Sequence, residues 1–180
     1  GSFNAMTVDG CTSTNDTVLI LAGGRAGAPD PTALAAAVAE ACLDLATQMV
    51  GDAEGHTKVV RVRVTGAADD REARQAARKV AESQFTQYSS FGPNPYWCRI
   101  ASKLPTAGVK VAPAVLTIAY GGTVVSHGCA PAEHDPDAVR AHMAGDQLDI
   151  HADLGVADGQ ARVLTNDLSY GYIDENKGTS

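Results

Sequence analysis

The feature that most constrains this chain is a polar loop that runs directly into an alternating strand pattern. Residues 59–64 read Val-Val-Arg-Val-Arg-Val, and this alternation of apolar and basic residues has the period of two expected of a half-buried strand. The preceding loop reads Asp52-Ala53-Glu54-Gly55-His56-Thr57-Lys58 and shows no periodicity. A carboxylate and an ammonium held on a loop by a rigid strand commonly form a site for a charged small molecule. The alternative is a surface loop whose charges are only solvated.

The length and charge of the chain limit the classes of protein to which it can belong. Its 180 residues fit one domain with its own core, so we expect residues 1–180 to form a single domain. The net charge is −7 and the basic residues are scattered, which argues against a nucleic-acid partner. We identify no apolar run of membrane-spanning length and no signal peptide, so we expect no membrane partner. Gly1-Ser2 is interpreted as a remnant of cloning.

The four cysteines argue against zinc or a disulfide framework, because they lie far apart and show no C-x-x-C spacing. His127 and Cys129 are two residues apart, but nothing nearby completes a metal site, so we expect no metal. Cys42 lies on the apolar side of a predicted helix and is interpreted as a small core residue. A reducing, cytoplasmic location follows from this cysteine usage.

The N-terminal part of the chain predicts one buried strand and one long helix. Residues 17–22 form a short apolar, β-branched run, which predicts a strand buried on both faces. Asp30 predicts a helix N-cap with Pro31 at the first helical position, and Gly51 ends the helix. Apolar residues then recur at helical spacing and should form one buried stripe: Leu34, Val38, Cys42, Leu45 and Met49. The intervening Gly23-Gly24-Arg25-Ala26-Gly27 has neither phosphate-loop spacing, so we reject a phosphate-binding role for it.

The rest of the chain predicts further strands, hairpins and helices. A helix begins at Asp69 or Asp70 and runs to about Ser83, with five small apolar residues facing inward: Ala73, Ala76, Ala77, Val80 and Ala81. The remaining elements are two hairpins, at Gly121-Gly122 and at Asp158-Gly159 between strands 148–153 and 160–166, and a short helix from Asp135-Pro136 to about Met143. This pattern predicts a layered α/β protein in which a mixed or antiparallel sheet packs against helices.

Three segments carry side chains that could contact a ligand. Residues 12–16 are rich in hydroxyl and amide groups, which either face a ligand or only stabilise turns. Residues 83–99 form the longest irregular stretch and contain the only Trp, so they either close over a substrate or pack as a structured flap. Residues 167–180 follow the last strand and are expected to be exposed and inert on their sequence alone.

Three motifs in order resemble the ornithine acetyltransferase (glutamate N-acetyltransferase) family. They are the loop at residues 52–58, the segment Asp9-Gly10-Cys11-Thr12-Ser13-Thr14-Asn15-Asp16-Thr17-Val18, and Asp153-Leu154-Gly155-Val156-Ala157-Asp158-Gly159-Gln160-Ala161. The resemblance is to the C-terminal part of the family's β chain and covers nearly all of these residues.

The resemblance implies an acetyltransferase of arginine biosynthesis. In this family a precursor cleaves itself before a Thr, which becomes the N-terminal nucleophile of the β chain and carries acetyl from N-acetylornithine to glutamate. It implies an N-terminal-nucleophile type of fold shared with an α chain, generally assembled as an α2β2 heterotetramer. It implies no cofactor, with acetyl-CoA as an alternative acetyl donor. The nucleophilic Thr is expected upstream of these residues, and the oxyanion-hole residues in the α chain, so this chain holds no catalytic residue of its own.

The resemblance assigns substrate-binding residues within this chain. Glu54 matches the substrate-binding Glu of the family's D-x-E-G-x-T-K motif, where a carboxylate can pair with the ammonium of an amino acid. Asn176 matches the family's C-terminal substrate-binding Asn. The family's last position is a Ser or Thr five residues after that Asn; here four residues follow Asn176, and the resemblance assigns this role to Ser180 or Thr179. Lys58 lies in the same motif as Glu54 and receives no specific role.

One segment departs from the family. Asn94-Pro95-Tyr96-Trp97-Cys98-Arg99 stands where the family has D-P-N-W-G-R, and residues 84–90 replace a lysine-bearing segment. Aromatic bulk is added where the family keeps a compact turn. A homologue that uses a different acyl donor or acceptor in specialised metabolism is therefore one alternative. The others are an amidase or peptidase on the same fold, and a non-catalytic subunit.

Overall fold

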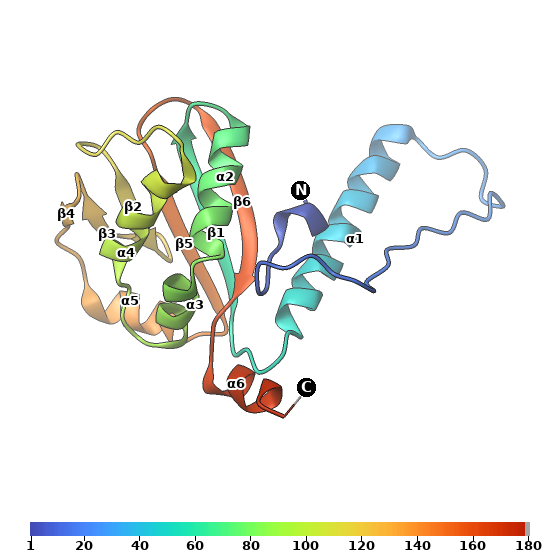
Figure 1. Ribbon diagram of the computed structural model, residues 1–180. Coiled ribbons are helices and arrows are strands. Elements are labelled where there is room, and N and C mark those ends of the chain that lie inside the picture. Colours follow the sequence, from blue (N-terminus) through green and yellow to red (C-terminus); the bar gives the residue numbers. More distant parts are fainter. Residues whose placement is uncertain (179–180) are drawn as a thin grey trace.

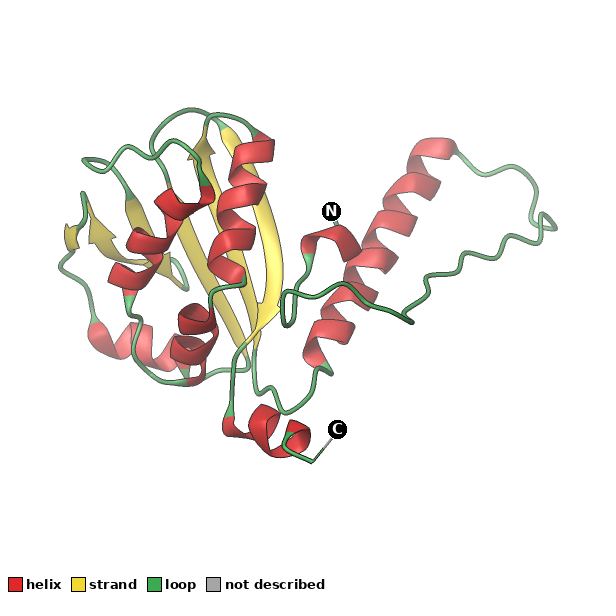
Figure 2. Cartoon of the chain, in the orientation of Figure 1, coloured by secondary structure: helices red, strands yellow, loops and turns green. Residues whose placement is uncertain are grey.

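The computed structural model describes residues 1–178 and contains one twisted sheet, helices packed on it, and an N-terminal arm (residues 9–51) that projects from it (Figure 1; Figure 2). In chain order the elements are η1 (Phe3–Ala5), α1 (Pro31–Gly51), β1 (Val59–Ala67), α2 (Asp70–Ala81), α3 (Gln84–Phe91), α4 (Trp97–Lys103), η2 (Leu104–Ala107), β2 (Thr117–Tyr120), β3 (Thr123–His127), β4 (Ala130–Pro131), α5 (Pro136–Met143), β5 (Gln147–Asp153), β6 (Gly159–Asn166) and α6 (Tyr170–Asn176).

The sheet is mixed, as the sequence predicts, and β1 lies near its centre. The strand order is β4-β3-β2-β5-β1-β6, in which β1 runs parallel to β5 and antiparallel to β6. The alternation in β1 has the expected consequence: Val60, Val62 and Val64 are buried, whereas Arg63 on the opposite face is exposed. The predicted α/β fold class is therefore confirmed.

One of the two predicted hairpins is correct. Gly121 and Gly122 connect the antiparallel strands β2 and β3 with φ values of 55° and 83°, a left-handed conformation that glycine adopts without steric cost. The hairpin at Asp158-Gly159 is wrong, although the strands on either side of it exist. β1 lies between β5 and β6, so the short connection at residues 154–158 crosses over one strand instead of joining neighbours.

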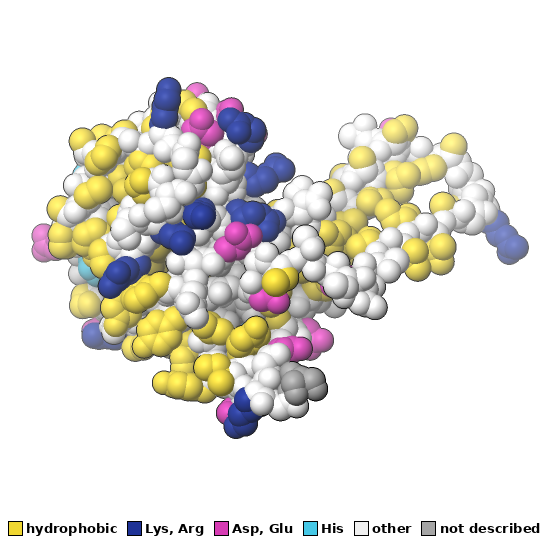
Figure 3. All heavy atoms as spheres, in the orientation of Figure 1, with side chains coloured by type: hydrophobic (Ala, Val, Ile, Leu, Met, Phe, Trp, Pro, Cys, Tyr) yellow, Lys and Arg dark blue, Asp and Glu magenta, His cyan; other side chains and the backbone are white. Residues whose placement is uncertain are grey.

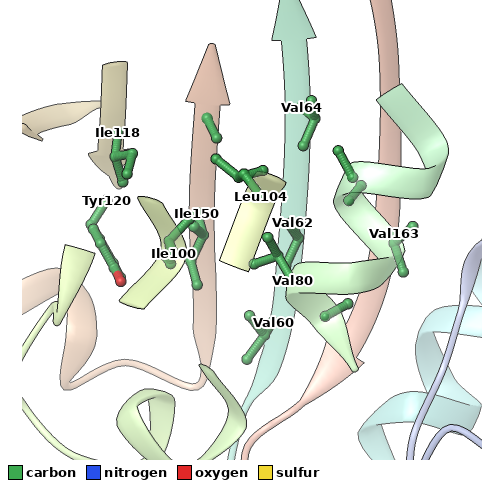
Figure 4. Packing of buried hydrophobic residues seen from close by; sticks show 14 of the residues in the cluster. Val60, Val62, Val64, Val80, Ile100, Leu104, Ile118, Tyr120, Ile150 and Val163 are labelled. Atoms are coloured by element: carbon green, nitrogen blue, oxygen red, sulfur yellow. The ribbon is translucent and has the colours of Figure 1, made fainter. Parts of the chain in front are cut away.

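The main core lies between the sheet and α2. Asp69 caps α2 by accepting a hydrogen bond from the Glu72 amide at 2.7 Å, and the five predicted inward residues of this helix are all fully buried. Figure 4 shows the side chains of β1, β5 and β2 meeting those of the helices, with Ile100 of α4 beside Ile150 and Leu104 of η2 between Ile150 and Val62. Small alanine side chains let α2 approach the sheet closely.

The N-terminal arm differs from the prediction in two ways. Residues 17–22 form no strand, and Leu19 and Leu21 are 76% and 92% exposed. A strand buried on both faces needs neighbouring elements, and this segment lies away from the sheet (Figure 1). Asp30 and Pro31 do begin α1, but only its C-terminal end packs on the sheet, through Ala46 and Val50.

The predicted stripe on α1 is therefore not buried, since Leu34 and Leu45 are each about half exposed. Contrary to the expectation from sequence, α1 is long and apolar enough to cross a membrane, by length and composition alone. That is weak evidence, because helices in soluble proteins and signal sequences meet the same criteria. Figure 3 shows apolar side chains gathered along the arm.

Residues 83–99 are mostly helical and not irregular. Ser83 caps α3, and α4 begins at Trp97. The Phe85 ring contacts Tyr88 and Tyr96 edge to face, with centroid distances of 6.0 and 5.4 Å, and the Arg99 guanidinium lies 4.6 Å from the same ring centroid. Of the two readings of this segment, the structure favours a packed flap.

Candidate functional site

The predicted substrate-binding residues Glu54 and Asn176 meet, although 122 positions separate them. The Asn176 amide donates hydrogen bonds from Nδ2 to Glu54 Oε2 at 2.7 Å and to the Tyr172 carbonyl at 2.9 Å. The residues belong to different elements, because Glu54 lies in the loop before β1 and Asn176 ends α6. Both side chains are exposed, so this carboxylate and this amide can contact a ligand.

The loop that carries Glu54 is fastened to the residues that follow β6. Asp167 is buried, and its carboxylate accepts hydrogen bonds from the Thr57 amide at 2.7 Å, the Thr57 hydroxyl at 2.6 Å and the Lys58 amide at 2.8 Å. Backbone amides and a hydroxyl thus satisfy the buried carboxylate. The sequence alone predicts residues 167–180 to be exposed and inert, so it does not predict this contact. An acid directly after a strand is the only sequence signal for it.

Lys58 is buried and lies at the C-terminal ends of two helices. Its ammonium donates to the carbonyl oxygens of Ser90 at 2.9 Å and Phe91 at 3.3 Å, at the end of α3, and of Met143 at 2.5 Å, at the end of α5. Burial lowers the pKa of Lys58, and the nearby Asp167 carboxylate opposes this shift. Lys58 therefore fixes the start of β1 through hydrogen bonds to backbone carbonyls.

Backbone contact between two glycines brings the loop against α6. A Cβ on Gly55, whose φ is +60°, would lie 2.1 Å from the Gly171 carbonyl carbon and 2.1 Å from the Tyr172 nitrogen. A residue with a side chain cannot occupy this position without displacing the first turn of α6. The glycine of the loop motif is therefore required by packing against the helix that ends at Asn176.

A pocket of about 320 Å³ is lined in part by α6, and neither Glu54 nor Asn176 lines it. Its walls combine residues of four segments: Val8, Asp9, Glu82, Gln84, Gln87, Asn166, Asp167, Leu168, Tyr172 and Ile173. Residues 83–99, here called the aromatic flap, contact the same helix. The rings of Phe91 and Tyr170 meet edge to face with their centroids 5.8 Å apart. Gln84 and Gln87, which belong to the segment that departs from the family, line the pocket together with Tyr172 and Ile173 of the helix that carries Asn176.

The other predicted positions are less informative. Thr179 and Ser180 lie outside the described residues. Residues 12–16 form an exposed turn in which the Asp16 amide donates to Ser13 Oγ at 2.7 Å, as turn chemistry predicts. Within residues 1–178 no group of three or more His, Cys, Asp or Glu side chains is placed to hold a metal ion. The thiol of Cys42 is free and partly buried.

One titratable residue with a shifted pKa lies on the sheet and not in this site. The pKa of His151 on β5 is lowered from 6.5 by burial and by the Arg63 guanidinium, and Asp153 opposes the shift. Its Nε2 lies 2.8 Å from the Thr65 hydroxyl. This contact joins β5 to β1 within the sheet.

Comparisons with known proteins show the family to which this chain belongs. The model of the ArgJ family matches residues 1–178. The arginine biosynthesis bifunctional protein ArgJ of Mycolicibacterium paratuberculosis is 40% identical over 99% of this chain, and a glutamate N-acetyltransferase of Methanopyrus kandleri is 38% identical over 97%. This chain spans 44% and 47% of the lengths of these relatives.

A solved structure gives the same result at the level of the fold. The crystal structure of an arginine biosynthesis bifunctional protein ArgJ from Bacillus halodurans superposes with a TM-score of 0.92 at 33% sequence identity. The match covers 98% of this chain and 87% of that chain. The family model covers nearly the whole sequence, and the three-dimensional arrangement agrees, so this chain belongs to the ArgJ family.

Proposed function

We propose that this chain is part of an acetyltransferase that moves an acetyl group from N-acetylornithine to glutamate. The observation that carries the proposal is the contact between the Glu54 carboxylate and the Asn176 amide at 2.7 Å, because the resemblance assigns both residues to substrate binding. The names of the relatives, ArgJ and glutamate N-acetyltransferase, support the same reaction.

In the proposed reaction an N-terminal Thr, expected upstream of these residues, attacks the acetyl carbonyl of N-acetylornithine. The Thr oxygen forms an ester with the acetyl group, the amide C–N bond breaks, and the leaving amine of ornithine takes up the proton of the Thr hydroxyl. The amine of glutamate then attacks the ester, an amide forms, and the Thr hydroxyl is restored. The reaction needs no cofactor, and acetyl-CoA is an alternative acetyl donor. Residues of this chain bind and orient the amino acids.

Within this scheme Glu54 pairs with an ammonium group of the substrate. A carboxylate and an ammonium form a charge-assisted hydrogen bond, which is stronger than a bond between neutral groups. Asn176 holds the carboxylate from its other side and leaves the second oxygen of Glu54 for the ligand. Asn176 therefore restricts the Glu54 rotamers before the substrate arrives, which reduces the entropy lost on binding.

The proposed partner is an α chain of the same precursor, in an α2β2 heterotetramer. Support comes from the arm, where consecutive apolar residues are 53–92% exposed: Val18, Leu19, Ile20 and Leu21. Contiguous exposed apolar surface of this kind marks a protein interface. Figure 3 shows it continuing along α1. The remaining part of the family's polypeptide is the occupant that we propose, and a cytoplasmic location goes with this assignment.

The test begins with intact mass spectrometry and N-terminal sequencing of the protein expressed from its complete gene. We expect two polypeptides, one of which starts at Thr and contains these residues, and transfer of acetyl from N-acetylornithine to glutamate. A single unprocessed polypeptide without transfer would instead support a non-catalytic subunit.

The role of Glu54 is tested by Glu54→Gln, which keeps the size and removes the charge. Loss of a charge-assisted hydrogen bond of about 1.5–3 kcal/mol should raise KM by about 10- to 150-fold. Glu175→Gln removes the carboxylate next to Asn176 and is the matched control, expected to leave KM unchanged. Equal kinetics for wild type and Glu54→Gln would defeat the assigned role.

A second candidate is the same acyl transfer with a different donor or acceptor, in specialised metabolism. The aromatic flap favours it, because Phe85, Tyr88 and Tyr96 add apolar surface and the Phe91–Tyr170 contact joins α3 to α6. An assay with N-acyl-ornithines of increasing chain length decides between the two. A preference for acyl groups longer than acetyl would support the second candidate.

A further inference from the structure

The Ser169 hydroxyl contacts both elements that carry the proposed substrate-binding residues. Its Oγ donates a hydrogen bond to the Gly55 carbonyl in the loop and accepts one from the Gly171 amide at 2.9 Å in the first turn of α6. A hydroxyl has one proton and two acceptor lone pairs, so both bonds form at once. Ser169 is only 5% exposed, and water has little access to this hydroxyl.

The loop and α6 approach each other so closely that little room remains for other groups to join them. The Gly55 backbone lies so close to Gly171 that a Cβ on Gly171 would be 3.0 Å from the Gly55 oxygen. At this approach no side chain fits between them, and Ser169 joins them by a side-chain hydrogen bond in addition to the one between Asn176 and Glu54.

The positions of Glu54 and Asn176 both depend on the hydrogen bonds that Ser169 makes to the loop and to α6. Glu54 directly precedes Gly55, and Asn176 ends the helix that Ser169 caps. The helix α6 has seven residues and none of its side chains is buried. A helix this short is unstable in isolation and depends on its cap and its contacts.

We propose that Ser169 is a positioning residue that sets the distance between Glu54 and Asn176. This inference rests on the proposed function, because it concerns the same pair of residues. It goes further by naming the hydroxyl that keeps the two side chains within hydrogen-bond distance. The hydrogen bonds of the Ser169 hydroxyl go to backbone atoms of Gly55 and Gly171. Ser169 acts through the Gly55 carbonyl on the loop and through the first turn of α6 on Asn176.

The variants separate this role from simple helix capping. Ser169→Ala removes both hydrogen bonds, and Ser169→Thr retains the hydroxyl. Ser83→Ala is the matched control, because Ser83 is also a buried serine N-cap, at α3, and makes no contact with the Glu54 loop. All three changes are made in the protein expressed from its complete gene.

The expected kinetic result is a change in KM with little change in kcat. Ser169→Ala should raise KM for the amino-acid substrate about 5- to 30-fold, as expected for the loss of a cap and a tether worth 1–2 kcal/mol. Ser169→Thr should stay within about threefold of wild type, and Ser83→Ala should leave KM unchanged. An equal rise in KM for Ser83→Ala and Ser169→Ala would overturn the proposal.

Hydrogen exchange tests the same proposal without relying on activity. In Ser169→Ala, peptides covering residues 52–57 and 170–176 should both lose protection, because one hydroxyl holds both segments. Loss of protection in residues 170–176 alone would reduce Ser169 to a helix cap and overturn the inference. If the wild-type protein transfers no acetyl group, the proposed function fails, while this exchange result still decides whether Ser169 joins the two segments.

Discussion

Replacement of Lys58 by Met tests whether the buried ammonium stabilises the junction of β1, α3 and α5. Met keeps most of the apolar stem and removes the three hydrogen bonds to the carbonyls of Ser90, Phe91 and Met143. The last carbonyls of a helix have no hydrogen-bond donor within the helix, so the substitution leaves these three carbonyls without the donor that Lys58 provides. At about 1 kcal/mol for each net hydrogen bond, the loss amounts to about 3 kcal/mol.

Part of this loss is recovered, because Met carries no charge that must be desolvated. The lowered pKa of Lys58 shows that burial outweighs the favourable effect of Asp167 on the ammonium. The loss of the hydrogen bonds outweighs the gain from no longer desolvating the ammonium, since the carbonyls remain buried in the variant. We therefore expect Lys58→Met to lower the free energy of unfolding by about 2 kcal/mol.

Urea unfolding followed by fluorescence measures this loss, because Trp97 is the only tryptophan in the sequence and packs against the main core. With a typical urea m-value of about 2 kcal/mol/M, the midpoint should fall by about 1 M. Lys110→Met at an exposed lysine is the control and should leave the midpoint unchanged. A midpoint that is unchanged or raised in Lys58→Met would refute the reasoning, because desolvation would then outweigh the hydrogen bonds.

Two further predictions concern the loop and the sheet. Gly55→Ala should lower the free energy of unfolding more than Gly108→Ala does. Gly108 has a similar φ but no atom near the added Cβ, so its replacement should lower that free energy by only about 1 kcal/mol. Hydrogen exchange should show lost protection of residues 170–176 in Gly55→Ala alone. Because the pKa of His151 is lowered in the folded state, the unfolded state binds more protons just below pH 6.5, and stability falls as the pH falls through that window. His151→Gln should flatten this dependence in urea unfolding, and an unchanged slope would contradict the assignment.

Several elements follow from local sequence signals alone. Asp30, Asp69 and Asp135 each cap the helix that the sequence predicts, because a short carboxylate satisfies the free amides of a first turn wherever the chain permits. The alternation in β1 and the Gly121-Gly122 turn are equally local, and both are confirmed. Glu54 and Asn176 were identified by resemblance and not by any local signal.

The tertiary structure decided what depends on distant partners. Residues 17–22 have the composition of a buried strand, but burial requires neighbours, and none lies beside them among the described residues. The strands β5 and β6 are separated by only a short connection, yet β1, from far earlier in the chain, lies between them. Periodicity indicates which face of a strand is buried and not which strand pairs with it.

The same distinction applies to the candidate site. The sequence shows a carboxylate on a loop and an amide near the C-terminus, and nothing local indicates that they meet at 2.7 Å. Ser169 and Asp167 acquire their roles only because β6 ends beside the loop that precedes β1. A hydrogen bond across more than 100 positions depends on the path of the whole sheet, so the residue types could be identified from sequence while their geometry could not.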